Sequence, residues 1–220
     1  EQVQRSGKVF VLFDVLGDNN RGETGELAAR VRYFKERAQS GASVVSDLPY
    51  YEDPRYWSGE LTWREGFTRV PYQDFAINTV KVDYVLSREP VGKVLDIGCA
   101  MGFLVKRLRA AGVDAYGVDI SHYAIERAPE DVKPFLSRVD VTRGLPFSDK
   151  EFDLVVSTGV MEHFTGAELE KVVAEITRVS KRGVIAITLK GDPGASEDLH
   201  HPTLKSLEEW QALFPGGFEV

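Results

Sequence analysis

Short apolar segments alternate with helical segments from residue 93 onward, and this alternation constrains the fold more than any other feature. The clearest apolar segments span residues 94–97, 115–118, 152–156 and 184–189. The last is continuous and rich in β-branched residues, as expected of a strand covered on both faces. Helical patterns follow them, beginning near Gly102, at Ser121 and at Ala167. Strands joined by helices predict an α/β fold with a doubly wound, mostly parallel sheet.

The N-terminal third of the chain is less regular. It holds an apolar run at 8–16 and a helix-like stretch at 23–39. We expect residues 1–71 to form an N-terminal extension or lid, and residues 72–220 to form the main domain, which opens with a helix at 72–87.

Composition excludes several classes of partner. The chain has 27 basic and 34 acidic residues, for a net charge of −7, whereas nucleic-acid binding needs a surplus of Lys and Arg. The single cysteine cannot form an internal disulfide and fits a reducing compartment. No apolar run reaches the ~18 residues of a membrane span. We therefore expect a cytoplasmic protein with neither a nucleic acid nor a membrane as partner.

The turn after the first apolar segment has the features of a ligand site. Gly98 and Gly102 allow a tight turn and close approach of the backbone, and the helix that begins near Gly102 directs free N–H groups toward the same place. Asp119 ends the next strand about 20 residues later, where a carboxylate can accept both ribose hydroxyls of a nucleoside.

These features could also belong to a site for a dinucleotide such as NAD, but the pattern departs from the dinucleotide fingerprint. The later glycine positions of G-x-G-x-x-G hold Ala100 and Phe103. Asp96, just before the turn, would repel a pyrophosphate but could anchor an ammonium group. The residues therefore favour a nucleoside that carries an amino acid.

Several segments in order resemble the motifs of class I S-adenosylmethionine-dependent methyltransferases. The first resembles motif I, with Ala100 in place of the usual middle glycine, and the others resemble the later motifs and the segment that follows the fourth strand. These segments are 94–102, 116–121, 140–141, 145–149, 152–157 and 160–164. The resemblance covers roughly residues 70 to 215 and is closest to small-molecule methyltransferases.

The resemblance implies S-adenosylmethionine as cofactor and roles for particular residues. Asp119 would hold the ribose, Asp140 and the Val141 N–H would contact the adenine, and Ser157 would help frame the methionine end. The full expected set is Asp96, Gly98, Cys99, Gly102, Asp119, Ile120, Asp140, Val141 and Ser157. Each of these residues, taken alone, is more often a turn, cap or strand-end residue than a ligand contact.

Two histidines are the candidate catalytic residues, and no metal ligands are expected. His163 follows the fourth strand, and His201 lies in a loop resembling the one that closes over the substrate in this family. A neutral histidine near an alcohol acceptor could take its proton. An acidic acceptor would need no base, and both histidines could instead be structural.

The acceptor is expected to be a small molecule methylated at oxygen. An aromatic-rich segment at 50–72 either packs as core or forms a lid over the cofactor. The alternatives are a protein or RNA methyltransferase, a NAD-dependent oxidoreductase and a non-catalytic binding protein. Class I sheets usually close with an antiparallel hairpin, of which only the first strand, near Phe218, is present. The run at 8–16 could therefore supply an edge strand, in this sheet or in a partner's.

Overall fold

A computed structural model of the protein describes residues 48–60, 71–88, 91–192, 201–216 and 218–220. The apolar run at 8–16 and the helix predicted at 23–39 lie outside these residues, so the edge-strand hypothesis stays a prediction. No helix in the described ranges is long and apolar enough to cross a membrane.

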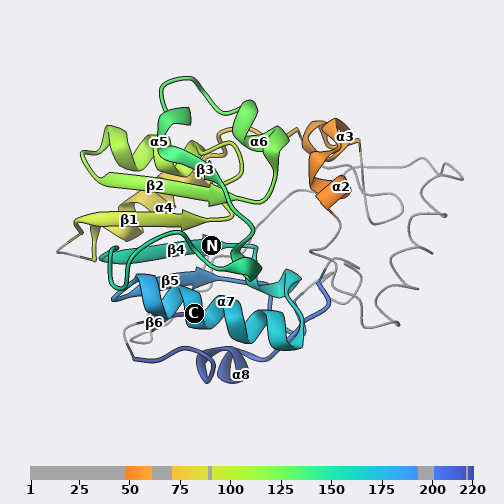
Figure 1. Ribbon diagram of the computed structural model, residues 1–220, viewed down its shortest axis with the longest axis vertical. Helices are drawn as coiled ribbons and strands as arrows, with labels where there is room; N and C mark the ends of the chain where they lie inside the picture. The colour runs from red at the N-terminus through yellow and green to blue at the C-terminus, as the bar shows by residue number, and fades with distance from the viewer. Residues whose placement is uncertain (1–47, 61–70, 89–90, 193–200, 217) are drawn as a thin grey trace, which may run out of the picture.

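Six parallel strands form the sheet of the described chain, in the order β3-β2-β1-β4-β5-β6 (Figure 1). They are β1 (Lys93–Ile97), β2 (Asp114–Asp119), β3 (Leu136–Arg138), β4 (Leu154–Thr158), β5 (Gly183–Ala186) and β6 (Phe218–Glu219). The strand order runs outward from β1 in both directions, so the switch point lies between β1 and β4. The predicted doubly wound parallel sheet is confirmed.

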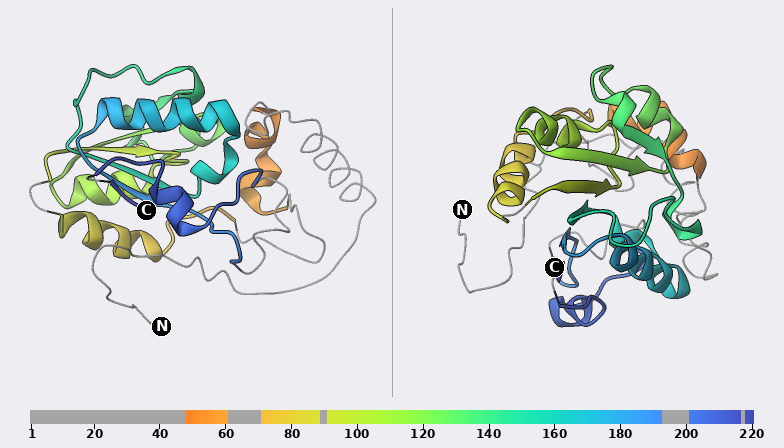
Figure 2. Two further views of the ribbon diagram at one scale, coloured as in Figure 1. Left: turned by 90° about the horizontal axis from the view of Figure 1, so that it is seen from below. Right: turned by 60° about the vertical axis from the view of Figure 1, so that its left-hand side comes forward.

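Helices cover both faces of this sheet (Figure 2). Successive strand residues point to opposite faces, so Val94 packs in one buried cluster with α4 and α5, while Leu95 packs in another with α7. The helices are α2 (Leu48–Glu52), α3 (Pro54–Ser58), α4 (Ile77–Leu86), α5 (Phe103–Ala110), α6 (His122–Glu126), α7 (Gly166–Val179) and α8 (Leu207–Gln211). Three short 3₁₀ helices are η1 (Lys133–Phe135), η2 (Val141–Arg143) and η3 (Met161–His163).

Two predicted boundaries were wrong for a physical reason that the structure shows. The strand predicted at 184–189 ends at Ala186, because the Thr188 backbone N–H and hydroxyl both donate to the buried Glu162 carboxylate, at 3.1 and 3.0 Å. The helix predicted at 72–87 begins only at Ile77. Before it, the Tyr72 N–H donates to the Trp57 carbonyl at 2.8 Å.

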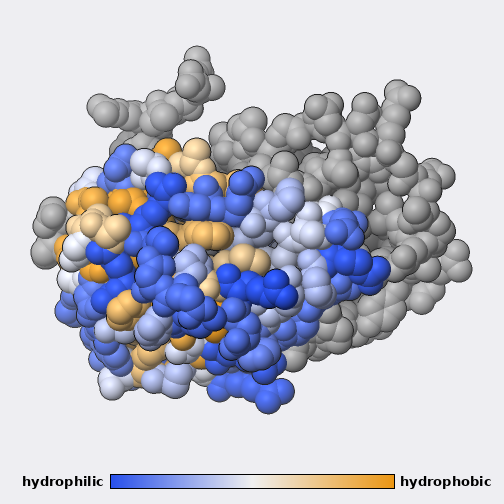
Figure 3. Space-filling model, turned by 90° about the horizontal axis from the view of Figure 1, so that it is seen from above, coloured by the Kyte–Doolittle hydropathy of each residue, from blue (hydrophilic) through white to orange (hydrophobic). Residues whose placement is uncertain are grey.

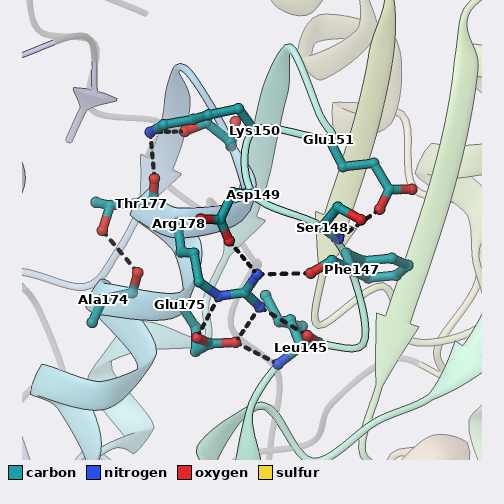
Figure 4. Close-up of polar contacts among 11 residues, drawn as sticks. Leu145, Phe147, Ser148, Asp149, Lys150, Glu151, Ala174, Glu175, Thr177 and Arg178 are labelled. Carbon is teal, nitrogen blue, oxygen red and sulfur yellow. Dashed lines mark hydrogen bonds and ion pairs between the residues drawn. The ribbon is translucent and has the colours of Figure 1, made fainter.

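The segment between η2 and β4 is held against α7 by one arginine (Figure 4). Arg178 donates to the carbonyls of Leu145 and Phe147 at 2.9 and 2.7 Å and pairs with Asp149 at 3.0 Å. Glu175, itself paired with Arg178, accepts from the Leu145 N–H at 2.7 Å. These contacts tie the chain that follows η2 to a long helix, and so stabilise the position of the Asp140–Val141 turn.

The surface on the β3 side of the sheet, seen from above in the orientation of Figure 1, carries no large apolar patch among the described residues. Hydrophilic side chains predominate there, with apolar ones in small groups between them (Figure 3). Val80 is the exposed large apolar side chain of the described chain, at 49% exposure. A single exposed apolar side chain of this kind is ordinary for a protein surface, and the described aromatic residues lie mainly in the core and around a cavity.

Candidate active site

A cavity of about 690 Å³ opens at the carboxyl ends of the parallel strands. That volume is typical of a site for a small organic ligand. Figure 1 shows α2 and α3 at the end of the sheet toward which the strand arrows point. The cavity is lined by these predicted site residues: Asp96, Gly98, Cys99, Asp119, Ile120, Asp140, Val141 and His163. The fold therefore brings together eight residues from four segments that lie far apart in the sequence.

The turn after β1 places two residues in the left-handed backbone region, which favours glycine. Gly98 has φ +77°, and a Cβ there would lie 2.2 Å from the Val160 side chain. Gly102 has φ +73° and precedes α5, and a Cβ there would meet Leu136. The N–H groups of Gly98 and Cys99 both donate to the Val118 carbonyl, which joins the turn to β2. This geometry lets the backbone border the cavity without intervening side chains.

Asp119 connects the end of β2 to that turn. One carboxylate oxygen accepts from the Ala100 N–H at 2.7 Å, and the other accepts from the Ser121 N–H at 2.9 Å. Burial raises the pKa of the Asp119 carboxyl, although the same backbone N–H groups oppose that shift. The carboxylate is held in one orientation and keeps further lone pairs for a ligand in the cavity.

A buried carboxylate and a lysine face the same part of the cavity. Asp96 of β1 is 5% exposed, and burial raises its pKa to about 7. The attraction of Lys81 on α4 opposes this shift, whereas the nearby Asp119 adds to it. Tyr72 lines the same wall, and burial together with Asp96 raises its pKa well above the usual range. Opposite charges placed together suit the ammonium and carboxylate of an amino acid.

Lys81 and Tyr72 were missed by sequence reasoning. Lys81 lies within a helix that precedes the recognisable motifs, and no local spacing links it to Asp96. Tyr72 was assigned only to an aromatic-rich segment with two alternative roles. The proximity of both residues to Asp96 depends on where α4 and the preceding segment pack.

Asp140 and Val141 form the part of the wall next to β3. The Asp140 side chain caps η2, accepting from the Thr142 N–H at 3.1 Å and the Thr142 hydroxyl at 2.6 Å. Its second oxygen pairs with the exposed Arg143 at 3.1 Å. Val141 is buried. Asp140 therefore caps a short helix and also lines the cavity. Because both roles are compatible with its position, adenine recognition by Asp140 stays a prediction.

Ser157 and Gly102 do not line the cavity. Ser157 is buried in β4, and its hydroxyl donates to the Ile97 carbonyl at 3.2 Å, across the β1–β4 junction. Gly102 lies under the turn, against Leu136. Cys99 borders the cavity, and burial raises the pKa of its thiol, which keeps it protonated as expected of a turn residue.

The two candidate catalytic histidines lie side by side at the β4 side of the site. Their ring centroids are 5.1 Å apart, and His163 also lies 6.3 Å from the Tyr51 ring. His163 lines the cavity, whereas His201 packs behind it. Burial, together with the nearby His163, lowers the pKa of His201 to about 3, so this imidazole is neutral at physiological pH.

The aromatic segment at 50–72 was expected either to pack as core or to form a lid over the cofactor. In the structure, its described part packs as core and also borders the cavity. Trp57 is buried in a cluster with Ala100 and Ala124, and it also lines the cavity together with Tyr51 and Tyr56. Trp63 and Phe67 of the same segment lie outside the described residues.

Together the fold and cavity define a Rossmann-like domain with a nucleoside-binding site at its switch point. Comparison with known proteins gives the family. Residues 95–188 match the family model described as a methyltransferase domain. An uncharacterised methyltransferase of Synechocystis sp. is 30% identical over 181 residues, which cover 76% of each chain. The chain belongs to the class I S-adenosylmethionine-dependent methyltransferases, and its cofactor is S-adenosylmethionine.

More distant similarities agree with this assignment. A sterol 24-C-methyltransferase of Yarrowia lipolytica is 29% identical over 182 residues, and the match covers 76% of this chain but 45% of that protein. The crystal structure of a SAM-dependent methyltransferase from Archaeoglobus fulgidus has a TM-score of 0.55 at 19% identity, covering 64% of this chain and 66% of that one. The second similarity shows the fold alone.

The cavity residues fit the cofactor chemically. A nucleoside needs a carboxylate for its ribose, which Asp119 supplies at the wall. The methionine end carries both charges, and Asp96 with Lys81 presents the complementary pair. The family membership overturns the alternative of a NAD-dependent oxidoreductase.

Proposed function

We propose that this methyltransferase acts on an oxygen atom of a small, uncharged acceptor. The observation that carries the proposal is the distribution of charge around the cavity. The charged side chains on its described wall are Lys81, Asp96, Asp119 and Asp140. They belong to α4, β1, β2 and the turn after β3. The described wall on the β4 side carries aromatic and apolar side chains and a histidine.

The strand order separates the two sides. Because β4 flanks β1 opposite to β2 and β3, a cofactor bound over β1, β2 and β3 leaves the β4 side for the acceptor. That side is lined by Thr158, Val160 and Phe164, with the Tyr51 ring from the N-terminal segment beside His163. An ionic acceptor would lose its hydration there without gaining a partner among these residues. An uncharged molecule of moderate size suits this wall.

The cofactor-binding roles that we propose follow the geometry. Asp119 binds the ribose hydroxyls, and Asp140, Val141 and Ile120 border the adenine. Asp96 accepts the ammonium group, and we add Lys81 as the partner of the methionine carboxylate. The backbone at Gly98 and Cys99 borders the methionine, while Gly102 and Ser157 stabilise the turn and the strand beneath it.

The protein contributes positioning and a route for one proton. When bound, S-adenosylmethionine supplies a methyl group on a positively charged sulfur. The aromatic side chains exclude water and orient the acceptor hydroxyl, which provides most of the acceleration for such a step. His163, at the cavity wall, accepts the proton that the hydroxyl loses, and the neutral His201 packs against its ring.

A protein or RNA acceptor is less compatible with the described structure. The chain carries a net charge of −7, and α2 and α3 supply part of the cavity wall. The sterol methyltransferase relative is named for a small-molecule acceptor too, but for methylation at carbon. Carbon is therefore the alternative acceptor atom that the experiment must separate from oxygen.

The test uses cofactor labelled with ¹³C in the methyl group. The purified protein is incubated separately with low-molecular-weight metabolites, with protein and with RNA. We expect the label in the small-molecule fraction, with the carbon chemical shift of a methyl bound to oxygen. A methyl resonance typical of carbon attachment, or label in the protein or RNA fraction, would overturn the proposal.

A further inference from the structure

The α2 helix is bound to the start of α6, 70 residues along the chain. The Glu52 carboxylate accepts from the His122 N–H at 2.8 Å and from the Tyr123 N–H at 2.7 Å. The neighbouring Tyr51 carbonyl accepts from the Ser121 hydroxyl at 2.7 Å. Three consecutive residues at the start of α6 thus donate to two consecutive residues of α2.

These contacts have a clear physical basis. The first N–H groups of a helix lack partners within the helix and carry a partial positive charge. A carboxylate that accepts two of them makes charge-assisted bonds, which are stronger than neutral ones. The Ser121 hydroxyl accepts from the Ala124 N–H and donates to Tyr51. Glu52 and Ser121 therefore stabilise α6 and attach α2 to it at once.

The same short stretch of chain holds the carboxylate that we assign to the ribose. The Ser121 N–H donates to Asp119, whose other oxygen accepts from Ala100 in the glycine turn. A continuous series of hydrogen bonds therefore leads from α2 through Ser121 and Asp119 to the turn beneath the cofactor.

The Tyr51 carbonyl of α2 also binds the aromatic wall of the cavity, through Trp57 of α3. The Trp57 indole N–H donates to the Tyr51 carbonyl at 2.8 Å, so that one carbonyl accepts from both Trp57 and Ser121. The Tyr51 ring lies beside His163, and Trp57 packs against Ala100. Moving α2 away from α6 would displace both aromatic side chains from the cavity wall.

We propose that Glu52 is a positioning residue that keeps Tyr51 and Trp57 over the cofactor, so that release of the cofactor requires the Glu52 contact with α6 to break. The inference rests on the proposed placement of the cofactor at Asp119, and it is independent of what the acceptor is. Glu52 does not line the cavity, and it acts through the residues that it positions.

The test measures the dissociation rate of S-adenosylhomocysteine, the demethylated cofactor, by stopped-flow fluorescence. Glu52→Ala removes both bonds, together with an exposed ion pair to Arg138 at 3.8 Å, and we expect release to accelerate about tenfold or more. Glu52→Gln keeps one acceptor oxygen, so its release rate should fall between Ala and wild type. Glu130→Gln is the matched control, because Glu130 is exposed and, among the described residues, pairs with the nearby Lys133.

A spectroscopic readout separates positioning from mere helix capping. The indole N–H resonance of Trp57, assigned with Trp57→Phe, should shift in both Glu52 variants and stay in place in Glu130→Gln. Wild-type release rates with an unshifted Trp57 resonance would overturn the proposal. If Glu52→Ala does not fold, Glu52→Gln carries the same comparison. If instead Asp119→Ala leaves ligand binding intact, the placement of the cofactor is what fails.

Discussion

The two sides of the cavity are built in different ways. The side that we assign to the cofactor consists of backbone at a glycine turn and of partly or fully buried charged groups, carried by β1, β2, α4 and the turn after β3. The side that we assign to the acceptor consists of the Tyr51 ring from α2 and of apolar side chains and a histidine from the segment after β4. Sheet hydrogen bonds hold most of the first side in place, whereas the second depends on how an N-terminal segment is attached. Substitutions of the charged groups should therefore change cofactor affinity, and substitution of the histidine should change turnover.

The largest expected effect comes from the buried charge at Asp96. The carboxyl has a pKa of about 7 in the folded protein against an ordinary value of 3.8. The folded state therefore binds the proton more tightly, and this group stabilises the fold at low pH and costs stability as the pH rises from about 4 to about 7. Asp96→Asn should raise the free energy of unfolding of the ligand-free protein at pH 8 by about 4 kcal/mol.

Urea unfolding at pH 8 and at pH 4 measures this difference, which should largely vanish at the lower pH. The same variant should bind S-adenosylhomocysteine more weakly, because the ammonium group loses its ionic partner. An Asn variant that is no more stable at pH 8 would mean that burial of the charged Asp96 carboxylate does not destabilise the fold.

The second effect concerns the ribose carboxylate. Asp119→Ala should weaken S-adenosylhomocysteine binding by about 2–3 kcal/mol, since two charge-assisted hydrogen bonds disappear from a partly buried site. Isothermal titration calorimetry on the folded variant gives the value. Asp114→Ala in the same strand is the control, because Asp114 is exposed and pairs with Arg109. Unchanged affinity would make Asp119 only a strand-end residue.

On the acceptor side, turnover should change while cofactor affinity does not. His163→Ala should lower the turnover rate at saturating cofactor by about tenfold or more, because a proton acceptor is lost. His201→Ala should have a smaller effect, since a histidine whose pKa is about 3 is a weak base at neutral pH. Rates measured across pH for both variants decide the matter. If neither falls tenfold, the enzyme acts by positioning alone.

The smallest effect is expected where the two sides meet, at Ala100. This residue has φ +50°, which costs about 1 kcal/mol for a non-glycine residue, but its methyl group packs against Trp57. Ala100→Gly removes both the backbone strain and the methyl contact, which oppose each other. The free energy of unfolding should therefore change by less than about 0.5 kcal/mol. Gly102→Ala, at φ +73° against Leu136, should destabilise by about 1–2 kcal/mol. A loss above 1 kcal/mol in Ala100→Gly would show that the methyl contact holds α3 in place.

Much of the cofactor side could be predicted because its signals are local. The strand, glycine turn and helix at 94–110 depend on residues close in sequence, and the positive φ angles at Gly98 and Gly102 match the need for glycine there. The Ser121 cap of α6 was likewise expected from residue type and is present. The strand predicted at Phe218 is also present, as β6.

On both sides of the cavity, the contacts that resisted prediction join distant segments. Nothing near Glu52 indicates that its carboxylate binds the start of a helix 70 residues away, and nothing near Lys81 indicates Asp96. The early end of β5 has the same origin, since Glu162 takes the amide that a longer strand would have used.

The order of apolar segments, turns and acidic residues by itself determined the class of fold, because backbone geometry and hydrophobic periodicity are controlled by neighbouring residues. The family and its cofactor were indicated by the resemblance of the motifs to a known family. Only the tertiary structure decided which charges meet in the cavity, that His201 is half-buried and neutral beside His163, and that α2 is attached to α6. Burial and long-range packing set the energy of a charge or a ring, and neither can be read from the residues that flank it.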